Sequence, residues 1–299
     1  MDSLGKALIT GASSGIGAIY ADRLAKRGYD LIVVARHQER LKAVLERISG
    51  DTNRSVEVMA ADLTNAADLR RVEQALRTDA TIELLVNNAG SAMTGHLAVS
   101  DVDDLETMIR LNVVAPTRLA AAVLPGFIAR GRGTLINVSS AVALAPEWIN
   151  GAYSGTKAYL LGLSVRLQHE LAGTGIRVQV VLPGAIRTGM WEKAGTDVAT
   201  LPPDILMDAG DLVDAALAGL DRDENVTIPS LPDLADWDAY ELARQNMIPK
   251  LSRNVPARRY RASRRTWSER DEPRASTVTD DGFLGGRRCR CHHRAHDHA

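Results

Sequence analysis

Two kinds of hydrophobic pattern alternate along the chain. Short runs such as Leu31-Ile32-Val33-Val34 are apolar at successive positions, which is typical of strands that are buried on both faces. The predicted strands are Lys6–Thr10, Asp30–Ala35, Ser55–Ala60, Ile82–Asn87, Gly133–Val138, Ile176–Leu182 and Asn225–Ile228. The longer segments between them have the apolar period of helices. The predicted helices are Ile16–Arg27, Gln38–Ile48, Ala66–Arg77, Val102–Ala129, Ala152–Ala172 and Asp211–Leu220.

This alternation predicts an α/β fold with a parallel sheet and helices on both of its faces. Because crossover connections between parallel strands are right-handed, the leading topology is a doubly wound, Rossmann-type sheet of about seven strands. Such a sheet binds ligands beyond the carboxyl ends of its strands. The residues that follow each predicted strand are therefore the candidates for a functional site.

Composition narrows the partners that we expect. The net charge is −1, so no overall field attracts nucleic acid or an anionic membrane. No apolar run approaches the ~18 residues of a membrane-spanning helix, and Met1–Lys6 lacks the features of a signal peptide. The two cysteines lie at the far end of the chain, which fits a reducing compartment. We expect a cytoplasmic protein with neither a membrane nor a nucleic acid as partner.

The last part of the chain differs from the rest in composition. Residues 256–299 hold 11 Arg against 6 Asp and Glu, a charge of +5 that leaves −6 for residues 1–255. Few of them are apolar, so burial there cannot offset the entropy of ordering. We predict a single domain over residues 1–254 and a disordered basic tail over residues 255–299. Cys289 and Cys291 lie in this tail at spacings that match no closed zinc site, so no metal site is predicted, and an accidental extension of the reading frame stays open.

A glycine-rich turn follows the first predicted strand and leads directly into a helix. Glycines allow a tight turn and let a pyrophosphate approach the helix N-terminus, where free N–H groups and the helix dipole favour anions. A turn that binds nothing is the alternative, but the position between first strand and first helix argues against it. The candidate cofactor-binding residues in this turn are Gly11, Ser13, Ser14, Gly15, Ile16 and Gly17.

Tyr153 and Lys157 are four residues apart on a predicted helix, which puts both side chains on one face. A phenol is a useful proton donor at neutral pH if its pKa falls from ~10 towards ~7. A lysine cation roughly 4 Å away supplies about the 4 kcal/mol that this shift requires. The pair predicts an acid–base group whose pKa the lysine lowers, although chance alone also produces such pairs.

Several motifs occur together in a fixed order, and their combination is far more specific than any one of them. In this order and spacing the chain resembles the short-chain dehydrogenase/reductase family over roughly residues 4–250. The motifs are Thr10-Gly-x-x-x-Gly-x-Gly17, Asn87-Asn88-Ala89-Gly90, Asn112, Ser140, Tyr153-x-x-x-Lys157 and Pro183-Gly184. The resemblance implies hydride transfer between a nicotinamide cofactor and a carbonyl or alcohol.

The resemblance also implies roles for the polar residues. Tyr153 is the expected general acid in reduction and base in oxidation, and Lys157 lowers its pKa and binds the nicotinamide ribose. Ser140 is expected to hydrogen-bond the substrate oxygen, with Ser139 as a rival that the spacing to Tyr153 disfavours. Asn112 is expected to hold a water in the proton relay. Its alternative role is to tie backbone together within a helix kink.

Further residues are expected to contact the cofactor. Asp62 matches the residue that contacts adenine, although it could instead cap the helix that begins near Ala66. Asn88 or Asn87 is expected to support the sheet beside the cofactor, and Thr188 to meet the carboxamide. The other cofactor positions that the resemblance implies are Ala89, Gly90, Pro183 and Gly184.

Arg36 indicates which cofactor is preferred. It follows the second predicted strand, at the place where an acidic residue would accept hydrogen bonds from an NAD ribose. An arginine cannot accept them, and its planar fork suits a 2′-phosphate. We therefore expect NADP(H) in preference to NAD(H). An exposed arginine at a helix start is the alternative.

The substrate is less well defined by the sequence. The loops expected around the pocket carry apolar side chains, and Ala185–Pro203 has the length of a mobile lid. These apolar residues are Met93, Leu144, Trp148, Met190 and Trp191, with Glu147 as the obvious charge. We expect an apolar carbonyl or alcohol substrate and a homodimer or homotetramer. A nucleotide-sensing protein without turnover is the alternative function, and a sugar-nucleotide epimerase is disfavoured by the glycine spacing.

Overall fold

The computed structural model describes residues 3–37, 39, 41, 48, 50–193, 197 and 200–260. They belong to two compact units, Met1–Trp237 and Asp238–Ala299. Most of the predicted helix Gln38–Ile48 and the chain beyond residue 260, with both cysteines, lie outside the described residues. The predicted domain boundary at residue 254 stays a prediction.

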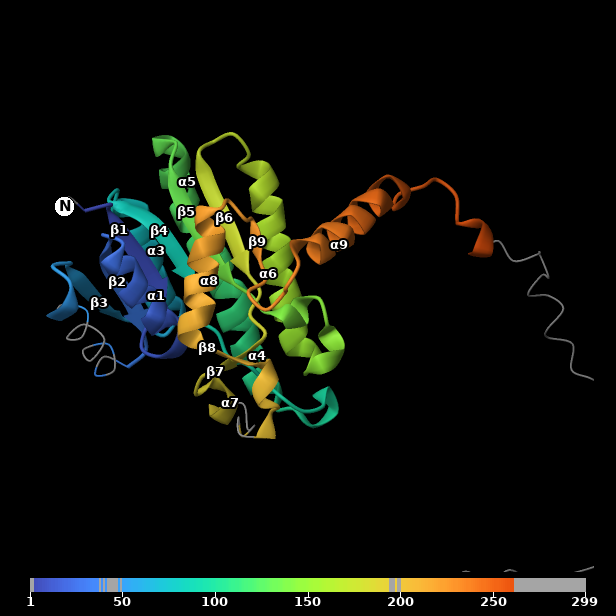
Figure 1. The fold of residues 1–299 in the computed structure, drawn as a ribbon, viewed down its shortest axis with the longest axis horizontal. Helices are drawn as coiled ribbons and strands as arrows, with labels where there is room; N and C mark the ends of the chain where they lie inside the picture. The colour runs from blue at the N-terminus through green and yellow to red at the C-terminus, as the bar shows by residue number, and fades with distance from the viewer. Residues whose placement is uncertain are drawn as a thin grey trace, which may run out of the picture. The chain divides into compact units, whose positions relative to one another are not determined.

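The first unit is built on a seven-stranded parallel sheet (Figure 1). Across the sheet the order is β3 (Val56–Ala60), β2 (Asp30–Ala35), β1 (Lys6–Thr10), β4 (Ile82–Asn87), β5 (Gly133–Val138), β6 (Ile176–Val181) and β9 (Val226–Thr227). The predicted Rossmann-type topology is confirmed. The strand order reverses between β1 and β4, which is where such sheets bind their ligands.

Helices cover both faces of this sheet. One face carries α1 (Gly15–Lys26) and α8 (Ala209–Asp221), and the other carries α3 (Ala66–Thr78), α5 (Ala115–Arg130) and α6 (Gly151–Glu170). Successive side chains of one strand point to opposite faces of the sheet. Ile9 packs into the cluster under α1, whereas its neighbour Leu8 packs into the cluster under α3 and α5.

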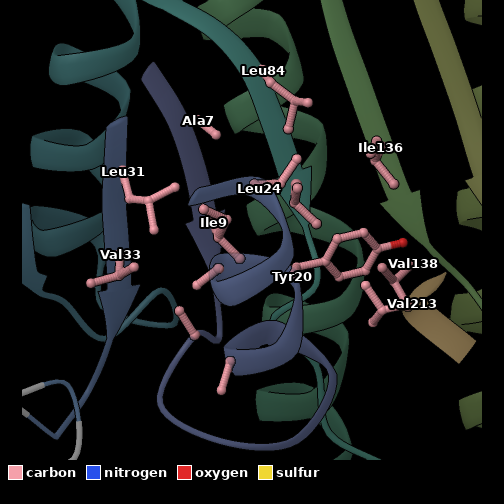
Figure 2. Packing of buried hydrophobic residues seen from close by; sticks show 14 of the residues in the cluster. Ala7, Ile9, Tyr20, Leu24, Leu31, Val33, Leu84, Ile136, Val138 and Val213 are labelled. Carbon is pink, nitrogen blue, oxygen red and sulfur yellow. The ribbon is translucent and has the colours of Figure 1, made fainter. Parts of the chain in front are cut away.

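The core under α1 is made of close-packed apolar side chains (Figure 2). Tyr20 and Leu24 of α1 pack with Ile9, Leu84 and Ile136 from three neighbouring strands. Each such side chain stabilises the fold by about 1.5–3 kcal/mol when it is fully buried. The hydroxyl of Tyr20 has no hydrogen-bond partner among the described residues, and burial raises the pKa of Tyr20.

The predicted long helix Val102–Ala129 contains an interruption. Helix α4 (Val102–Ile109) and α5 are joined by a π-helical turn, Arg110–Val114. Val102–Arg130 is also the one helix of the described residues that is long and apolar enough to cross a membrane, with 44% of its apolar window buried. Its buried side chains, including Leu119 and Phe127, belong to the core cluster, so packing against the sheet accounts for its apolar character.

Four elements near the end of the described chain were not predicted. The expected lid segment contains β7 (Ala185–Arg187) and α7 (Met190–Lys193), and β7 pairs in parallel with β8 (Leu206–Asp208). The boundary between the two units falls inside α9 (Leu234–Met247). Short strands and a mostly exposed helix have weak hydrophobic patterns, which is why periodicity does not reveal them.

Candidate active site

The glycine-rich turn between β1 and α1 is closed by backbone contacts. A Cβ on Gly17 would lie 2.4 Å from the Gly11 carbonyl oxygen and 2.5 Å from Asn88 Nδ2, so only glycine fits there. Gly11 and Gly15 have φ angles of +68° and +53°, in the left-handed region. Ser14 is the N-cap of α1 but makes no side-chain cap bond, which leaves first-turn N–H groups available for an anion.

The loop after β4 is fixed beside this turn. Thr10 Oγ1 accepts hydrogen bonds from the N–H groups of Asn88 and Ala89, each at 3.0 Å. Asn88 Nδ2 donates in return to the Thr10 carbonyl at 2.9 Å. Asn87 points into the sheet, where its amide donates to Asn137 Oδ1 at 3.0 Å. Asn88 thus shapes the glycine turn, and Asn87 ties β4 to β5.

Gly90 is the point at which three elements meet. A Cβ there would lie 3.1 Å from Asn112 Oδ1 and 3.6 Å from Lys157 Nζ. Asn112 is buried in the π-helical turn and bonds Ser91 twice, accepting from its N–H at 3.0 Å and donating to its carbonyl at 2.9 Å. Its amide therefore ties backbone together, as the alternative expectation proposed, and the predicted water-holding role stays a prediction.

The predicted reacting groups lie together at the end of β5. Ser140 is the second residue after this strand, and its side chain hydrogen-bonds Tyr153 of α6. Ser139 Oγ instead donates to the Lys157 carbonyl at 2.7 Å, so the rival hydroxyl is committed to the backbone of α6. Lys157 Nζ donates to the Val138 carbonyl at 3.1 Å. The geometry favours Ser140 over Ser139 as the group beside Tyr153.

Burial dominates the electrostatics of this pair. Tyr153 is 5% exposed and Lys157 is 7% exposed. Desolvation raises the pKa of Tyr153 to about 12, although the bond from Ser140 lowers it, and desolvation lowers the pKa of Lys157 to about 8. The expected lowering of the Tyr153 pKa is therefore wrong for this structure. The lysine Nζ is 5.8 Å from the centre of the tyrosine ring and is directed at a carbonyl instead.

Two further residues predicted to contact the cofactor lie after β2 and β3, on the opposite side of β1 from β5. Arg36 follows β2, is exposed, and makes no ion pair with any residue in the described part of the chain. Asp62 follows β3, and its Oδ1 accepts from the N–H and the hydroxyl of Thr64 at 2.9 and 2.7 Å. The expected alternative for Asp62 is wrong, because Asn65 caps α3.

The segment after β6 lies against both the glycine turn and Ser140. The Pro183 carbonyl accepts from the Ala141 N–H at 2.8 Å and from Ser140 Oγ at 3.3 Å. Thr188 follows β7, and its Cγ2 lies 3.4 Å from a Cβ built on Gly15. Thr188 Oγ1 is buried and has no partner among the described residues. A carboxamide would satisfy this hydroxyl, so the residues present fit a dinucleotide that runs from Arg36 to Thr188.

The apolar residues that the sequence assigns to the substrate side lie in three segments, after β4, after β5 and after β7. Leu144 packs against the cluster at the end of β6, and Trp191 Nε1 donates to the Ile186 carbonyl at 2.8 Å. Met93 and Met190 are half-buried, whereas Trp148 is 74% exposed. No group of His, Cys, Asp and Glu side chains that could hold a metal occurs among the described residues.

The family profile of short chain dehydrogenases matches residues 5–199. The chain belongs to this family. A solved short-chain dehydrogenase from Sphingobium yanoikuyae, in complex with NADPH, is 49% identical, with a TM-score of 0.84 over 86% of this chain and 100% of that one. The bulky-bulky ketone specific alcohol dehydrogenase from Comamonas testosteroni is 43% identical, with a TM-score of 0.79 over 86% and 98% of the two chains.

Among curated relatives, human 17-beta-hydroxysteroid dehydrogenase type 3 is 32% identical over 201 residues, which cover 66% of this chain and 64% of that protein. These short-chain dehydrogenases are named for oxidation or reduction of alcohols and ketones. The protein is accordingly an oxidoreductase of the short-chain dehydrogenase family.

Three residues that position this site were not identified from the sequence. Thr10 appears there only as the start of the glycine motif, yet its hydroxyl holds the loop after β4. Thr156 accepts from Asn112 Nδ2 at 3.1 Å, and Asn150 caps α6. An asparagine just before a predicted helix is a capping signal that could have pointed to Asn150.

Replacing Lys157 tests its burial through the pH dependence of stability. The pKa of Lys157 falls from 10.5 to about 8 on folding, so holding it charged opposes folding below pH 8. This penalty disappears as the pH rises from 8 to 10.5. Relative to Lys157→Met, the wild-type protein should gain on the order of 2–3 kcal/mol of unfolding free energy across that window. Urea unfolding at a series of pH values measures the difference.

The exposed Lys250 provides the control, since Lys250→Met should follow the wild-type dependence on pH. A constant difference between wild type and Lys157→Met from pH 8 to 10.5 would show that the buried amine keeps its ordinary pKa.

Proposed function

We propose that the protein is an NADPH-dependent reductase of ketones with apolar substituents, able to run in reverse as an alcohol dehydrogenase. The observation that carries the proposal is the meeting of Ser140, Tyr153 and Lys157 beyond the end of β5, next to a glycine turn that fits a pyrophosphate.

The chain's own residues handle the proton. A bound nicotinamide supplies the hydride that reduces the carbonyl carbon. The Tyr153 hydroxyl donates its proton to the carbonyl oxygen, and the Ser140 hydroxyl hydrogen-bonds the same oxygen. Lys157, whose amine lies on the same side of α6, stabilises the phenolate that remains. A pKa of about 12 keeps Tyr153 protonated at neutral pH, which suits proton donation in the reductive direction.

The preference for NADPH rests on Arg36. This exposed cation follows β2 and is not engaged by another described residue, so it is free to bind a 2′-phosphate. The S. yanoikuyae structure contains NADPH, and a metagenomic short-chain oxidoreductase at 29% identity is described in complex with NADP. Both relatives support the proposed cofactor for this chain.

The proposed apolar substrate class rests on the side chains of the loops that follow β4, β5 and β7. Leu144, Met93, Met190 and Trp191 offer apolar surface, and none of them carries a charge that would bind an ionic group. The C. testosteroni relative, at 43% identity, is described as specific for ketones with two bulky groups. We therefore propose bulky, uncharged ketones. A nucleotide sensor would bind NADPH tightly and turn over no ketone, aldehyde or alcohol in a panel followed at the nicotinamide absorbance.

Replacing the phenol tests the proposed chemistry. Tyr153→Phe removes the proton donor while keeping the ring, so ketone reduction should fall by about 10²–10⁴-fold with NADPH binding largely intact. Steady-state kinetics and NADPH fluorescence titration measure the two effects. Tyr260→Phe, at a tyrosine that is 69% exposed and lies outside α6, is the control and should keep its activity. Activity of Tyr153→Phe within tenfold of wild type would assign the proton to another group.

Replacing Arg36 tests the cofactor preference. Arg36→Asp repels a 2′-phosphate and offers a ribose acceptor, so the preference should change from NADPH to NADH. A charge-assisted contact contributes about 1.5–3 kcal/mol, equivalent to roughly ten- to 150-fold in affinity, and exposure places the effect at the lower end. Values of kcat/KM with both cofactors decide the point. Arg222→Asp, at the exposed end of α8, is the control; a wild type that prefers NADH contradicts the assignment.

We also propose that the protein forms a homodimer or homotetramer through α5 and α6. Tyr159 of α6 bonds Thr117 of α5 at 3.0 Å, and the same pair of helices exposes Ile128. Light scattering should give a multiple of the 32.3 kDa mass of one chain. Ile128→Lys should weaken the assembly and shift the measured mass toward that of the monomer. The exposed Ile205 lies outside these helices, so Ile205→Lys is the control. A wild type that is monomeric at micromolar concentration rules the assembly out.

A further inference from the structure

We propose that Asn150 is a positioning residue that fastens the connection between β4 and α4 onto the start of α6. Residues 91–100 of this connection form the substrate-side wall beside Tyr153, and Asn150 sets the position of this wall. The proposal rests on the proposed function, because it concerns the substrate side of the same site. It starts from a side chain that is 4% exposed although Trp148, two residues earlier, is 74% exposed.

The oxygen of Asn150 does what any helix cap does. Asn150 Oδ1 accepts from the Ala152 N–H at 2.9 Å, which satisfies one of the free donors of the first turn of α6. An aspartate or a serine would provide this oxygen equally well. What only asparagine adds at this position is the side-chain NH₂ group.

That NH₂ group reaches across to the other segment. Asn150 Nδ2 donates to the Gly95 carbonyl at 2.9 Å and to Ser100 Oγ at 3.3 Å. Ser100 Oγ donates in turn to the His96 carbonyl at 3.0 Å. One buried amide therefore holds both ends of the short segment 95–100, whose apolar residues Leu97 and Val99 are 61% and 83% exposed.

A second asparagine holds the beginning of the same connection. Asn112 bonds Ser91 twice and donates to Thr156 of α6 at 3.1 Å. Asn150 and Thr156 lie three residues before and three residues after Tyr153. The connection from residue 91 to residue 100 is therefore attached to α6 on both sides of Tyr153, which fixes the distance between its side chains and the phenol.

This arrangement separates the wall from the chemistry. The Asn150 amide touches neither the Tyr153 hydroxyl nor the glycine turn, so loosening it should release the wall and leave proton donation and cofactor binding in place. Loss of the wall lowers the affinity for a bulky ketone, because a mobile segment must be ordered again on each binding event. The effect should appear in KM and spare kcat.

Asn150→Asp tests the proposal. It keeps the size and the capping oxygen, removes both donors and sets a carboxylate against the Gly95 carbonyl. Hydrogen exchange of peptides that cover residues 93–100 should become at least about fivefold faster. KM for a bulky ketone should rise about tenfold, with kcat and the NADPH dissociation constant within about threefold of wild type. Ser100→Ala should give a smaller change in the same direction.

Asn65→Asp is the matched control. Asn65 caps α3 by accepting hydrogen bonds from the Ala67 and Asp68 N–H groups. The Asn65→Asp variant should therefore equal the wild type in hydrogen exchange of residues 93–100 and in kinetics. Unchanged exchange in Asn150→Asp overturns the proposal, and so does faster exchange with an unchanged KM. An equal loss of kcat and NADPH affinity also overturns it, because Asn150 would then act through α6 as a whole.

The test also distinguishes this proposal from the proposed function. If the wild-type protein reduces no ketone, the proposed function fails. Hydrogen exchange still decides whether Asn150 fastens residues 93–100, because that measurement requires no turnover.

Discussion

Two hydrogen bonds between the end of β5 and the middle of α6 determine where every reacting group lies. Ser139 Oγ donates to the Lys157 carbonyl, and Lys157 Nζ donates to the Val138 carbonyl. Strand β5 is paired on both sides, with β4 and β6, so its end cannot move without breaking the sheet. The helix that carries Tyr153 is thereby held in register with Ser140 by a strand that is paired on both sides.

The same edge of the sheet depends on amide side chains that link one element to the next. Asn88 joins β4 to the glycine turn, Asn137 donates to Ser164 of α6, and Asn112 and Asn150 attach the connection after β4 to α6. A buried amide is costly unless it is hydrogen-bonded, so each of these residues tolerates only the arrangement that satisfies it. Rigidity at the site comes from this requirement, while the apolar clusters below provide the bulk of the stability.

The sequence predicted the strands, the topology and the groups around Tyr153 because strong signals carry them. Buried strands such as Leu31–Val34 are continuously apolar, and the glycine turn and Tyr153-x-x-x-Lys157 have fixed spacings. The double role of Asn150 was not predictable, because its amide bonds residues 50 and 55 positions away, at Ser100 and Gly95. The prediction for the pKa of Tyr153 is wrong because a spacing of four residues shows only that two side chains share one face of a helix. It does not show how deeply they are buried.

Burial also explains why one tyrosine can work without a lowered pKa in this structure. Removing water makes the phenolate unfavourable, so Tyr153 stays protonated and is ready to give its proton to an alkoxide, a much stronger base. The phenolate forms only as that proton leaves, and the Lys157 cation is then its nearest compensating charge. At the 5.8 Å between Lys157 Nζ and the ring centre, and at an effective dielectric of 20, their attraction is about 3 kcal/mol, which offsets part of the desolvation. The Lys157 cation therefore stabilises the site more after proton transfer than before it. An interaction that strengthens as the reaction proceeds lowers the barrier and so accelerates the step.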